Sequence, residues 1–457
     1  MKKMTSSANV SAVRCGIAVL LLASVSFGQA IQLSKSVGPP TTQTLVSGEH
    51  FPADTVVNLY FDRLGVGQVT TDGTGSFSDV PIQVPKGALP GKHYVIGKAQ
   101  TEAKARFLVR TNWPQYGFGS NGGRHNPFEN VLSPKNVDKL TLRFSYSAPA
   151  GLGPPVVSGG MVYSSSNDGN VYALTADTGT LVWKAEGYGP ALADGIVYFM
   201  GSGSDTFLYA RNAKTGALVW AFNIQISAFA PVVSGKVVYV TAATVAGYDL
   251  FALDARTGFL FWRDFIWATP DLGAPAIAKG TIYVGASGSS SSDLLAVSNG
   301  SVLWQYPIAV SSSPAAVNGV VYAGSADDNV YAMDATTGSL RWKYSAAKSV
   351  YSSPAVAEGF VYAGSADGSI YALNAGTGAL VWKRSIGYFA MSPAVANGVV
   401  YVVSSNGNVY HLNALNAKTG VPLWKYVVKP EPTDPVVANG MVYFGSGDGN
   451  LYALGLP

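Results

Sequence analysis

Tryptophan recurs along this chain at a nearly constant interval. Seven copies are separated by gaps of 37 to 42 residues, and they are Trp183, Trp220, Trp262, Trp304, Trp342, Trp382 and Trp424. A period of this length indicates one supersecondary unit copied many times, because a single unit cannot bury its apolar faces alone. The spacing therefore constrains the fold more than any other feature of the sequence.

The unit that ends at Trp382 gives the clearest copy of the repeat. Alternating apolar residues lie between three breaks, Glu358-Gly359, Asp367-Gly368 and Thr377-Gly378. Alternation with a period of two is typical of half-buried strands, and Asp-Gly accepts the positive φ of a two-residue hairpin turn. Each unit is predicted to form a small four-stranded antiparallel sheet, whose tryptophan packs against the neighbouring sheet.

The last copy of the repeat is incomplete. It begins at Pro435 and stops after Leu451–Leu454, without a fourth strand. Residues 138–147 have the pattern of that strand, with Phe144 at the tryptophan position, so we expect them to complete the last sheet. The predicted fold of residues 113–457 is an all-β, eight-bladed β-propeller, in which closure leaves no long exposed sheet edge.

The repeated string from Tyr371 to Trp382 resembles the tryptophan-docking repeat of pyrroloquinoline-quinone (PQQ)-type propellers. The segment Trp113-Pro114-Gln115-Tyr116-Gly117, followed by Gly123-Arg124, is similar to the lead-in to the first blade of that family. The resemblance implies one of two branches: quinoprotein alcohol dehydrogenases, or non-enzymatic propellers such as the lipoprotein subunit of the outer-membrane barrel assembly machinery. The fold alone does not choose between them.

For the enzymatic branch, the resemblance implies a calcium-bound quinone on the axis, sandwiched by a vicinal cysteine pair and a tryptophan. The chain has one cysteine, Cys15, so that pair cannot form. Residues just before each repeat proline are expected to line an axial funnel that could bind a ligand; they are Tyr188, Phe229, Trp267, Asp271, Ser311 to Ser313, Tyr351, Phe389 and Asp434.

Two members of this funnel set are carboxylates, and neither aligns with the catalytic aspartate of the family. We therefore predict no catalytic residue, no metal site and no cofactor, and a platform that binds or assembles protein or polysaccharide at the cell envelope. The alternative is a PQQ-dependent dehydrogenase, which would need PQQ and calcium at the funnel.

Individual funnel residues have two interpretations each. Asp271 and Asp434 could form a paired-carboxylate site, but exposed carboxylates are the norm, so solvated loop charges are the favoured interpretation. Trp267 lies outside the repeat register. It could stack on a sugar or another flat ligand, or it could be a hydrophobic plug over the axis, which is the favoured interpretation.

The first thirty residues have the pattern of an export signal. Lys2, Lys3 and Arg14 precede an apolar run, Cys15–Gly28, that is too short to span a bilayer. Residues 1–30 are predicted to be a cleaved signal peptide, with an N-terminal membrane anchor as the alternative. Without them, 27 basic residues (30 minus 3) face 26 acidic ones, a balance that does not favour nucleic acid. The product is expected in the periplasm or outside the cell, as a monomer without a stable membrane span.

Residues 31–42 are predicted to be a loose linker. Residues 43–110 then show short alternating stretches separated by turns such as Asp72-Gly73 and Pro90-Gly91, which favours a small immunoglobulin-like β-sandwich. An elaborated lid of the propeller is the alternative. The boundary between the two domains is expected near Arg110 to Trp113.

Overall fold

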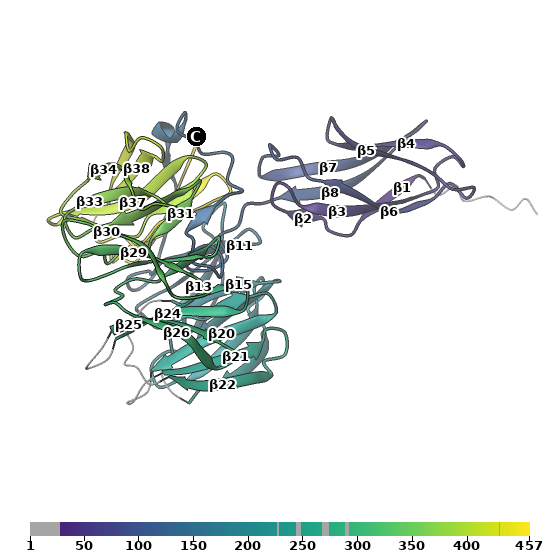
Figure 1. Ribbon diagram of the computed structural model, residues 1–457. Helices are drawn as coiled ribbons and strands as arrows, with labels where there is room; N and C mark the ends of the chain where they lie inside the picture. Colours follow the sequence, from purple (N-terminus) through teal and green to yellow (C-terminus); the bar gives the residue numbers. More distant parts are fainter. Residues whose placement is uncertain (1–27, 226–227, 244–247, 267–273, 288–291, 429) are drawn as a thin grey trace, which may run out of the picture. The chain divides into compact units, whose positions relative to one another are not determined.

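A computed structural model of the chain describes residues 28–225, 228–243, 248–266, 274–287, 292–428 and 430–457. Within these ranges the regular structure is β, apart from the short 3-10 helix η1 (Val137–Lys139) (Figure 1). None of the described helical structure is long and apolar enough to cross a membrane. The chain divides into two compact units, and the second contains Lys35–Thr44, Gln83–His93 and Arg106–Pro457.

Eight described strands precede Arg110, and they form two sheets of order β1-β3-β6 and β2-β8-β7-β4-β5. Their bounds are β1 Ala30–Leu33, β2 Val37–Gly38, β3 Gln43–Glu49, β4 Val56–Phe61, β5 Leu64–Thr70, β6 Phe77–Gln83, β7 Gly91–Lys98 and β8 Glu102–Val109. Buried and exposed side chains alternate along β3 and β4, as they do in strands with one face on a core; in β4 the buried residues are Val57, Leu59 and Phe61.

Residues 31–42 were expected to be a loose linker, and this prediction is wrong because the segment contains regular strands. Most of β1 and the whole of β2 lie in it: β1 pairs antiparallel with β3, and β2 pairs parallel with β8. The polar residues between them are held through backbone groups, since the Lys35 amide and carbonyl both bond to the Thr44 hydroxyl. Backbone pairing of this kind leaves no signal in the composition of a short polar segment.

The repeats form consecutive antiparallel sheets, here numbered in chain order. The first to third sheets contain β11 Val156–Ser158, β12 Met161–Ser165, β13 Asn170–Thr175 and β14 Leu181–Glu186; β15 Tyr188–Ala193, β16 Ile196–Met200, β17 Phe207–Asn212 and β18 Leu218–Asn223; and β19 Val232–Ser234, β20 Val237–Ala243, β21 Tyr248–Asp254 and β22 Leu260–Ile266. The fourth to sixth contain β23 Ala276–Ala278, β24 Thr281–Ser287, β25 Ser292–Ser298 and β26 Ser301–Pro307; β27 Ala315–Val317, β28 Val320–Gly324, β29 Asn329–Asp334 and β30 Leu340–Ser345; and β31 Ala355–Ala357, β32 Phe360–Gly364, β33 Ser369–Asn374 and β34 Leu380–Ser385.

The seventh and eighth sheets draw on the segment before the first sheet. The seventh contains β36 Ala394–Ala396, β37 Val399–Asn406, β38 Val409–Asn416 and β39 Pro422–Val428, with β9 (His125–Asn126) parallel to β36 and β35 (Phe389–Ala390) beside β37. The eighth has the order β10-β42-β41-β40, with β10 Thr141–Ser147, β40 Val436–Ala438, β41 Met441–Gly445 and β42 Asn450–Gly455. Within it, Phe144 lies opposite Ala453.

Neighbouring sheets are joined by two side chains that share one acceptor. The Trp382 indole N–H donates to the Ala417 carbonyl at 2.9 Å, and the Tyr362 hydroxyl donates to the same oxygen at 3.0 Å. The equivalent pairs on one carbonyl are Trp183 and Tyr163 on Ala213, Trp220 and Tyr198 on Ala255, Trp304 and Tyr283 on Ala335, and Trp342 and Tyr322 on Ala375. These bonds satisfy polar groups inside an otherwise apolar interface.

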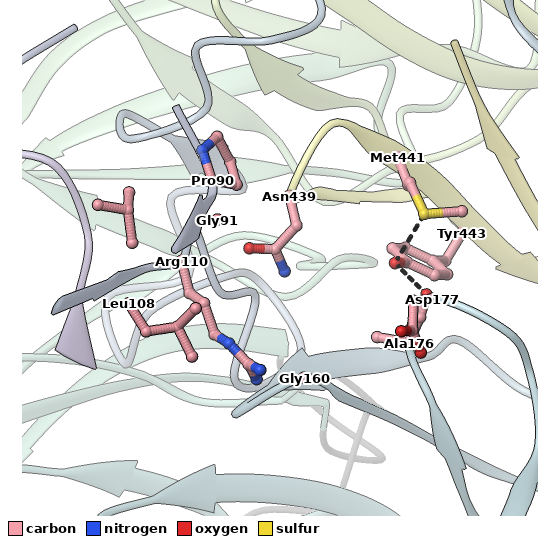
Figure 2. Close-up of a pocket in the computed structure, with 11 residues that line it drawn as sticks. Pro90, Gly91, Leu108, Arg110, Gly160, Ala176, Asp177, Asn439, Met441 and Tyr443 are labelled. Atoms are coloured by element: carbon pink, nitrogen blue, oxygen red, sulfur yellow. Dashed lines mark hydrogen bonds between the residues drawn. The ribbon is translucent and has the colours of Figure 1, made fainter. Parts of the chain in front are cut away.

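The eighth sheet contacts the first through a related but reduced interface. The Tyr443 hydroxyl donates to the Ala176 carbonyl at 2.8 Å, as drawn in Figure 2. Phe144 packs beside this ring at 6.4 Å between centroids, and as a phenylalanine it has no N–H to add. Among the described residues, no acceptor is found for the indole N–H of Trp262 or of Trp424. The repeat therefore docks with both hydrogen bonds at five interfaces and with the tyrosine bond alone between the eighth and first sheets.

Candidate functional site at the sheet edges

The segment 113–126 runs past the innermost strands of successive sheets and caps their free edges. Its contacts with backbone amides of those strands are Trp113 O with Val157, Pro114 O with Leu192, Gln115 Oε1 with Val233, Ser120 O with Ile277, Asn121 O with Ala316, Gly123 O with Val356 and Arg124 O with Val395. Asn126 adds a bond from its side-chain amide to the Val437 carbonyl. One non-repeating segment thus touches every numbered sheet and satisfies edge groups that would otherwise be unpaired.

Glycine lets this segment approach the strands closely. A Cβ on Gly122, whose φ is 68°, would lie 2.5 Å from the Pro314 carbonyl oxygen. Only a residue without a side chain fits at that separation and that dihedral angle. His125, which lies in β9, is buried enough that desolvation lowers its pKa. The segment is therefore part of the core.

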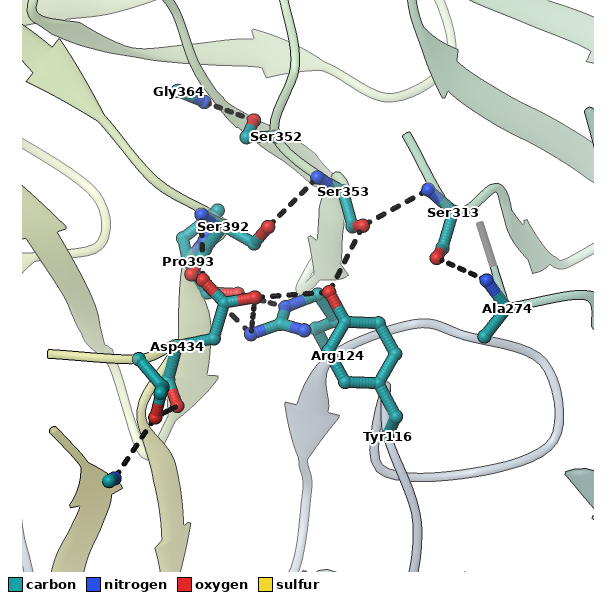
Figure 3. A network of polar contacts seen from close by, with 12 residues as sticks. Tyr116, Arg124, Ala274, Ser313, Ser352, Ser353, Gly364, Ser392, Pro393 and Asp434 are labelled. Carbon is teal, nitrogen blue, oxygen red and sulfur yellow. Dashed lines mark hydrogen bonds and ion pairs between the residues drawn. The ribbon is translucent and has the colours of Figure 1, made fainter. Parts of the chain in front are cut away.

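Arg124 is the most buried charge in this region, at 1 % exposure. Its Nε donates to the Pro393 carbonyl at 2.7 Å, and Nη2 lies 3.4 Å from Asp434 Oδ2 (Figure 3). The guanidinium also lies over the Tyr116 ring, 5.0 Å from its centroid. A buried charge is tolerated when a counter-charge and hydrogen bonds surround it, as they do here.

Asp434 is the partner of both Arg124 and Tyr116. The Tyr116 hydroxyl donates to Asp434 Oδ2 at 3.0 Å, and the Ser392 amide donates to Oδ1 at 3.2 Å. Burial, followed by the nearby Asp434 charge, raises the pKa of Tyr116, which keeps its hydroxyl a donor at neutral pH. The expectation that Asp434 is a solvated loop charge is wrong, because Arg124 supplies a counter-charge from a distant part of the chain.

A series of hydrogen bonds from backbone amides to side-chain oxygens links neighbouring sheets and ends at Asp434. Each acceptor lies just before a repeat proline, and each accepts a bond from the amide of the equivalent residue in the preceding sheet. The bonds are Ala274 to Ser313 (2.8 Å), Ser313 to Ser353 (3.1 Å), Ser353 to Ser392 (3.0 Å) and Ser392 to Asp434 (Figure 3). The series ends at Asp434, which stands where three preceding repeats have serine. Asp434 therefore takes part both in this series and in the ion pair with Arg124.

Two hollows meet at Tyr116 and Pro154. One, of about 270 Å³, is lined by proline and aromatic residues that include Pro190 and Phe229. The other, of about 350 Å³, is lined by Asp434 together with loop residues such as Thr433. The first is just below, and the second near the lower end of, the range of about 300–1,000 Å³ that ligand pockets usually occupy.

The structure brings together only part of the predicted funnel. Phe229 and Asp434 line the two hollows, whereas Tyr351 is 49 % exposed and belongs to neither. Tyr188 lies in β15 opposite Met200 of β16, Phe389 lies in β35 opposite Ser405 of β37, and neither lines the hollows. Trp267 and Asp271 lie outside the described residues. Tyr116 and Arg124, which both contact Asp434, stand out in the sequence only as part of the family-like lead-in.

The described residues here do not fit a calcium-bound quinone. Calcium takes six to eight oxygen ligands, with carboxylates prominent among them. Asp434 and the exposed Glu431 are the described carboxylates that line the hollows, and the oxygens of Asp434 already accept from Arg124, Tyr116 and Ser392. In the part of the chain that the structure describes, no three His, Cys, Asp or Glu side chains gather as a metal site.

Comparison with protein families gives one match to most of the chain. The sequence model of the family described as outer membrane protein assembly factor BamB, a PQQ-type repeat, matches residues 138–194, 185–313, 299–388 and 366–456. Among curated relatives, the quinone alcohol dehydrogenase subunit of Gluconobacter oxydans (strain 621H) is 27 % identical over 194 residues, 39 % of this chain and 21 % of the relative. Assembly factor BamB of Yersinia pestis is 26 % identical over 258 residues, 47 % of this chain and 62 % of the relative. The chain thus spans less than two thirds of either.

Solved structures of both kinds share the fold. BamB from Moraxella catarrhalis has a TM-score of 0.56 at 20 % identity, covering 69 % of this chain and 99 % of that chain. A europium-containing methanol dehydrogenase has a TM-score of 0.61 at 15 % identity, covering 76 % of this chain and 98 % of that one. At these identities the likeness establishes a β-propeller of the PQQ and BamB type and leaves the activity open.

Proposed function

The chain belongs to the propeller family described as outer membrane protein assembly factor BamB, and from this membership we propose an exported, non-catalytic binding and assembly platform. In this proposal the numbered sheets are the eight blades of a closed ring, preceded by an immunoglobulin-like module. Residues 1–30 are removed on export to the periplasm or the cell exterior. The partners are proteins or polysaccharides of the cell envelope.

The observation that carries the proposal is that the innermost strands, where a cofactor would bind, are instead bonded to one segment that holds the sheets together. Segment 113–126 bonds to the innermost strands, and the Arg124–Asp434 pair is buried among them. A catalytic carboxylate must be free to take a proton or a metal, whereas this one is fully engaged. Support for binding comes instead from the periphery, where loops vary on a rigid array of repeats.

The rims of the sheets favour macromolecular partners. The fourth strands of the first six sheets expose apolar side chains just before their tryptophans, among them Leu181, Val219, Phe261, Leu303 and Val381. Exposed apolar side chains that recur on neighbouring elements are typical of surfaces that meet another macromolecule. A rigid array of this kind can hold several partners without a conformational change.

The platform is tested by capture from a native envelope fraction on immobilised full-length chain. The proposal expects the same protein or polysaccharide to be retained reproducibly and to be released by excess free chain. A matched bait in which Leu181, Val219 and Val381 are changed to serine should retain less of it. Retention of nothing above an unrelated propeller bait would contradict the platform.

The alternative is a quinoprotein dehydrogenase, favoured by the partial identity to the Gluconobacter subunit. It is separated from the platform by titrating the purified chain with PQQ and calcium while following the quinone absorbance and dye-linked alcohol oxidation. The platform proposal expects no saturable spectral change. Saturation with alcohol-dependent turnover would replace it by the enzyme.

A further inference from the structure

One position of the repeat differs in the seventh sheet. In five other sheets a tyrosine on the third strand donates its hydroxyl to an aspartate four residues earlier; the pairs are Tyr172–Asp168, Tyr209–Asp205, Tyr331–Asp327, Tyr371–Asp367 and Tyr452–Asp448. Asn413 lies opposite Lys425 in the same register in which Tyr371 lies opposite Lys383. Asn413 therefore takes the tyrosine position, and Val409 stands where the aspartate would be.

The substitution removes both partners of the neighbouring lysine. In the sixth sheet, Lys383 Nζ bonds to Asp367 Oδ2 at 2.8 Å and lies 4.8 Å from the centre of the Tyr371 ring. Lys425 has neither contact, and no other ion pair is found for it among the described residues. Its ammonium is an exposed positive charge at the edge of the space that the missing ring leaves.

That space is a hollow of about 560 Å³. Its wall includes Asn413, Lys425, Trp424, Asn406 and Ser385, with Tyr388 beside them at 70 % exposure. The volume is within the range of small-molecule sites, and the lining combines aromatic rings with a few placed polar groups. The cleft lies between the sixth and seventh sheets, beside the position at which five other sheets have the tyrosine.

The Asn413 amide is held in one orientation. Its Nδ2 donates to the Ser404 hydroxyl at 2.9 Å and to the carbonyls of Val402 and His411 at 3.2 Å each. These bonds use its donors and leave Oδ1 without a partner among the described residues. An oriented carbonyl oxygen beside a free ammonium offers one acceptor for a hydroxyl and one cation for a carboxylate.

We propose that this cleft, lined by Asn413, Lys425, Trp424 and Tyr388, binds a carboxylated sugar unit of an acidic polysaccharide. A sugar ring presents an apolar C–H face to an aromatic side chain and hydroxyls at its edge, which suits Tyr388 and Asn413. The single cation matches the single negative charge of a uronic acid. A peptide strand is disfavoured here because Pro422, which begins the outer strand β39, has no N–H to pair with it.

The inference rests on the polysaccharide form of the proposed platform, and its test uses the full-length chain at low salt. Calorimetry would follow trigalacturonic acid and its methyl ester, which keeps the sugar but removes the charge. We expect saturable binding of the acid and about ten-fold weaker binding of the ester. Equal affinity for both, or no binding of the acid by the native chain, would overturn the site.

Two variants keep the test specific. Asn413→Tyr restores the residue of the other repeats and fills the cleft, so binding should be lost while the melting temperature is kept. Lys425→Gln should reduce binding of the acid to the level of the ester, whereas Lys343→Gln, at the equivalent position beside Tyr331, should change nothing. Unchanged binding by Asn413→Tyr or Lys425→Gln would overturn the proposal even if one of them were less stable.

The remaining outcomes separate this site from the platform. Displacement of the sugar by a hexa-aspartate peptide at similar concentration would replace the sugar by an acidic peptide and overturn the assignment. If Asn413→Tyr retains the envelope partner but the native chain binds no sugar, the platform stands and the cleft proposal falls. If the native chain binds the sugar but captures no envelope partner, the cleft stands and the broader platform falls.

Discussion

Arg124 Nη2 lies 3.4 Å from Asp434 Oδ2, and the two side chains are 2 % and 9 % exposed. The pair joins the segment before the first sheet to the entrance of the eighth sheet. Because both charges are buried, each depends on the other for solvation. It therefore fixes the two parts of the chain that must meet for the array of sheets to close.

Arg124→Met is expected to destabilise the fold strongly. The change leaves the Asp434 carboxylate buried without its counter-charge, and breaking one side of a buried pair costs about 3–5 kcal/mol. Guanidinium unfolding measures the loss. The matched control is Arg341→Met, which breaks a pair with Asp334 whose side chains are 46 % and 27 % exposed and should cost about 1 kcal/mol or less. A loss for Arg124→Met no larger than the control would show that the pair does not hold the array closed.

The docking tryptophans should differ according to their hydrogen bonds. Trp382→Phe removes the bond to the Ala417 carbonyl and is expected to cost about 0.5–1.5 kcal/mol beyond the smaller ring. Trp424→Phe removes only ring area, because no described acceptor faces its indole N–H. Urea unfolding of the two variants measures the difference, and equal losses would contradict a role for the shared carbonyl.

Gly378 is expected to tolerate alanine poorly because of the indole above it. A Cβ would lie 2.6 Å from the Trp342 ring, at a φ of 72°. Gly319 has a similar φ of 77° with open space around it, so Gly319→Ala measures the cost of the dihedral angle alone. Gly378→Ala should lose about 1–3 kcal/mol more than Gly319→Ala in chemical unfolding. A difference near zero would place the ring elsewhere.

Alkaline pH should weaken the fold through its tyrosines. Burial is the largest cause that raises the pKa of Tyr116, Tyr362 and Tyr443, and burial with the Asp448 bond raises the pKa of Tyr452 to about 12. A raised folded pKa gives stability that is complete below the unfolded pKa of about 10 and is lost as pH rises through the folded pKa.

Absorbance of tyrosinate at alkaline pH provides the check. The buried tyrosines should ionise late, together with loss of folded structure in circular dichroism, and the midpoint of urea unfolding should fall above pH of about 10. Ionisation of all tyrosines near pH 10 in a folded chain would contradict the burial of these hydroxyls.

The periodic part of the fold was predictable from sequence because its signal is local. Alternation, turn residues and the tryptophan period repeat within each unit, so they predict small sheets arranged as a propeller, and the resemblance of the repeated string implies its PQQ type. The site was less predictable because segment 113–126 has no period and its partners come from every sheet. The burial of Asp434 was not predictable for the same reason, because its partner Arg124 is far away in the sequence.

Positions that differ from the repeat carry the sequence signal for the two candidate sites. Asp434 stands where Ser313, Ser353 and Ser392 stand in preceding units, and Asn413 stands where most units have tyrosine. Their meaning depends on register, because the hairpin between β37 and β38 is longer than its counterparts and shifts a simple alignment. A repeat protein is therefore best searched for function at the positions that break its own pattern.

The central claim is that segment 113–126 serves the cohesion of the array and that its contacts engage Asp434, so that this carboxylate is not free to hold calcium and a quinone. Native-state hydrogen exchange with mass spectrometry tests it on peptides that contain the amides of Ile277, Ala316, Val356 and Val395, each bonded to this segment. We predict exchange only through global unfolding, unchanged by PQQ and calcium. Fast exchange of these amides in the folded chain, or new protection when quinone and calcium are added, would contradict the account.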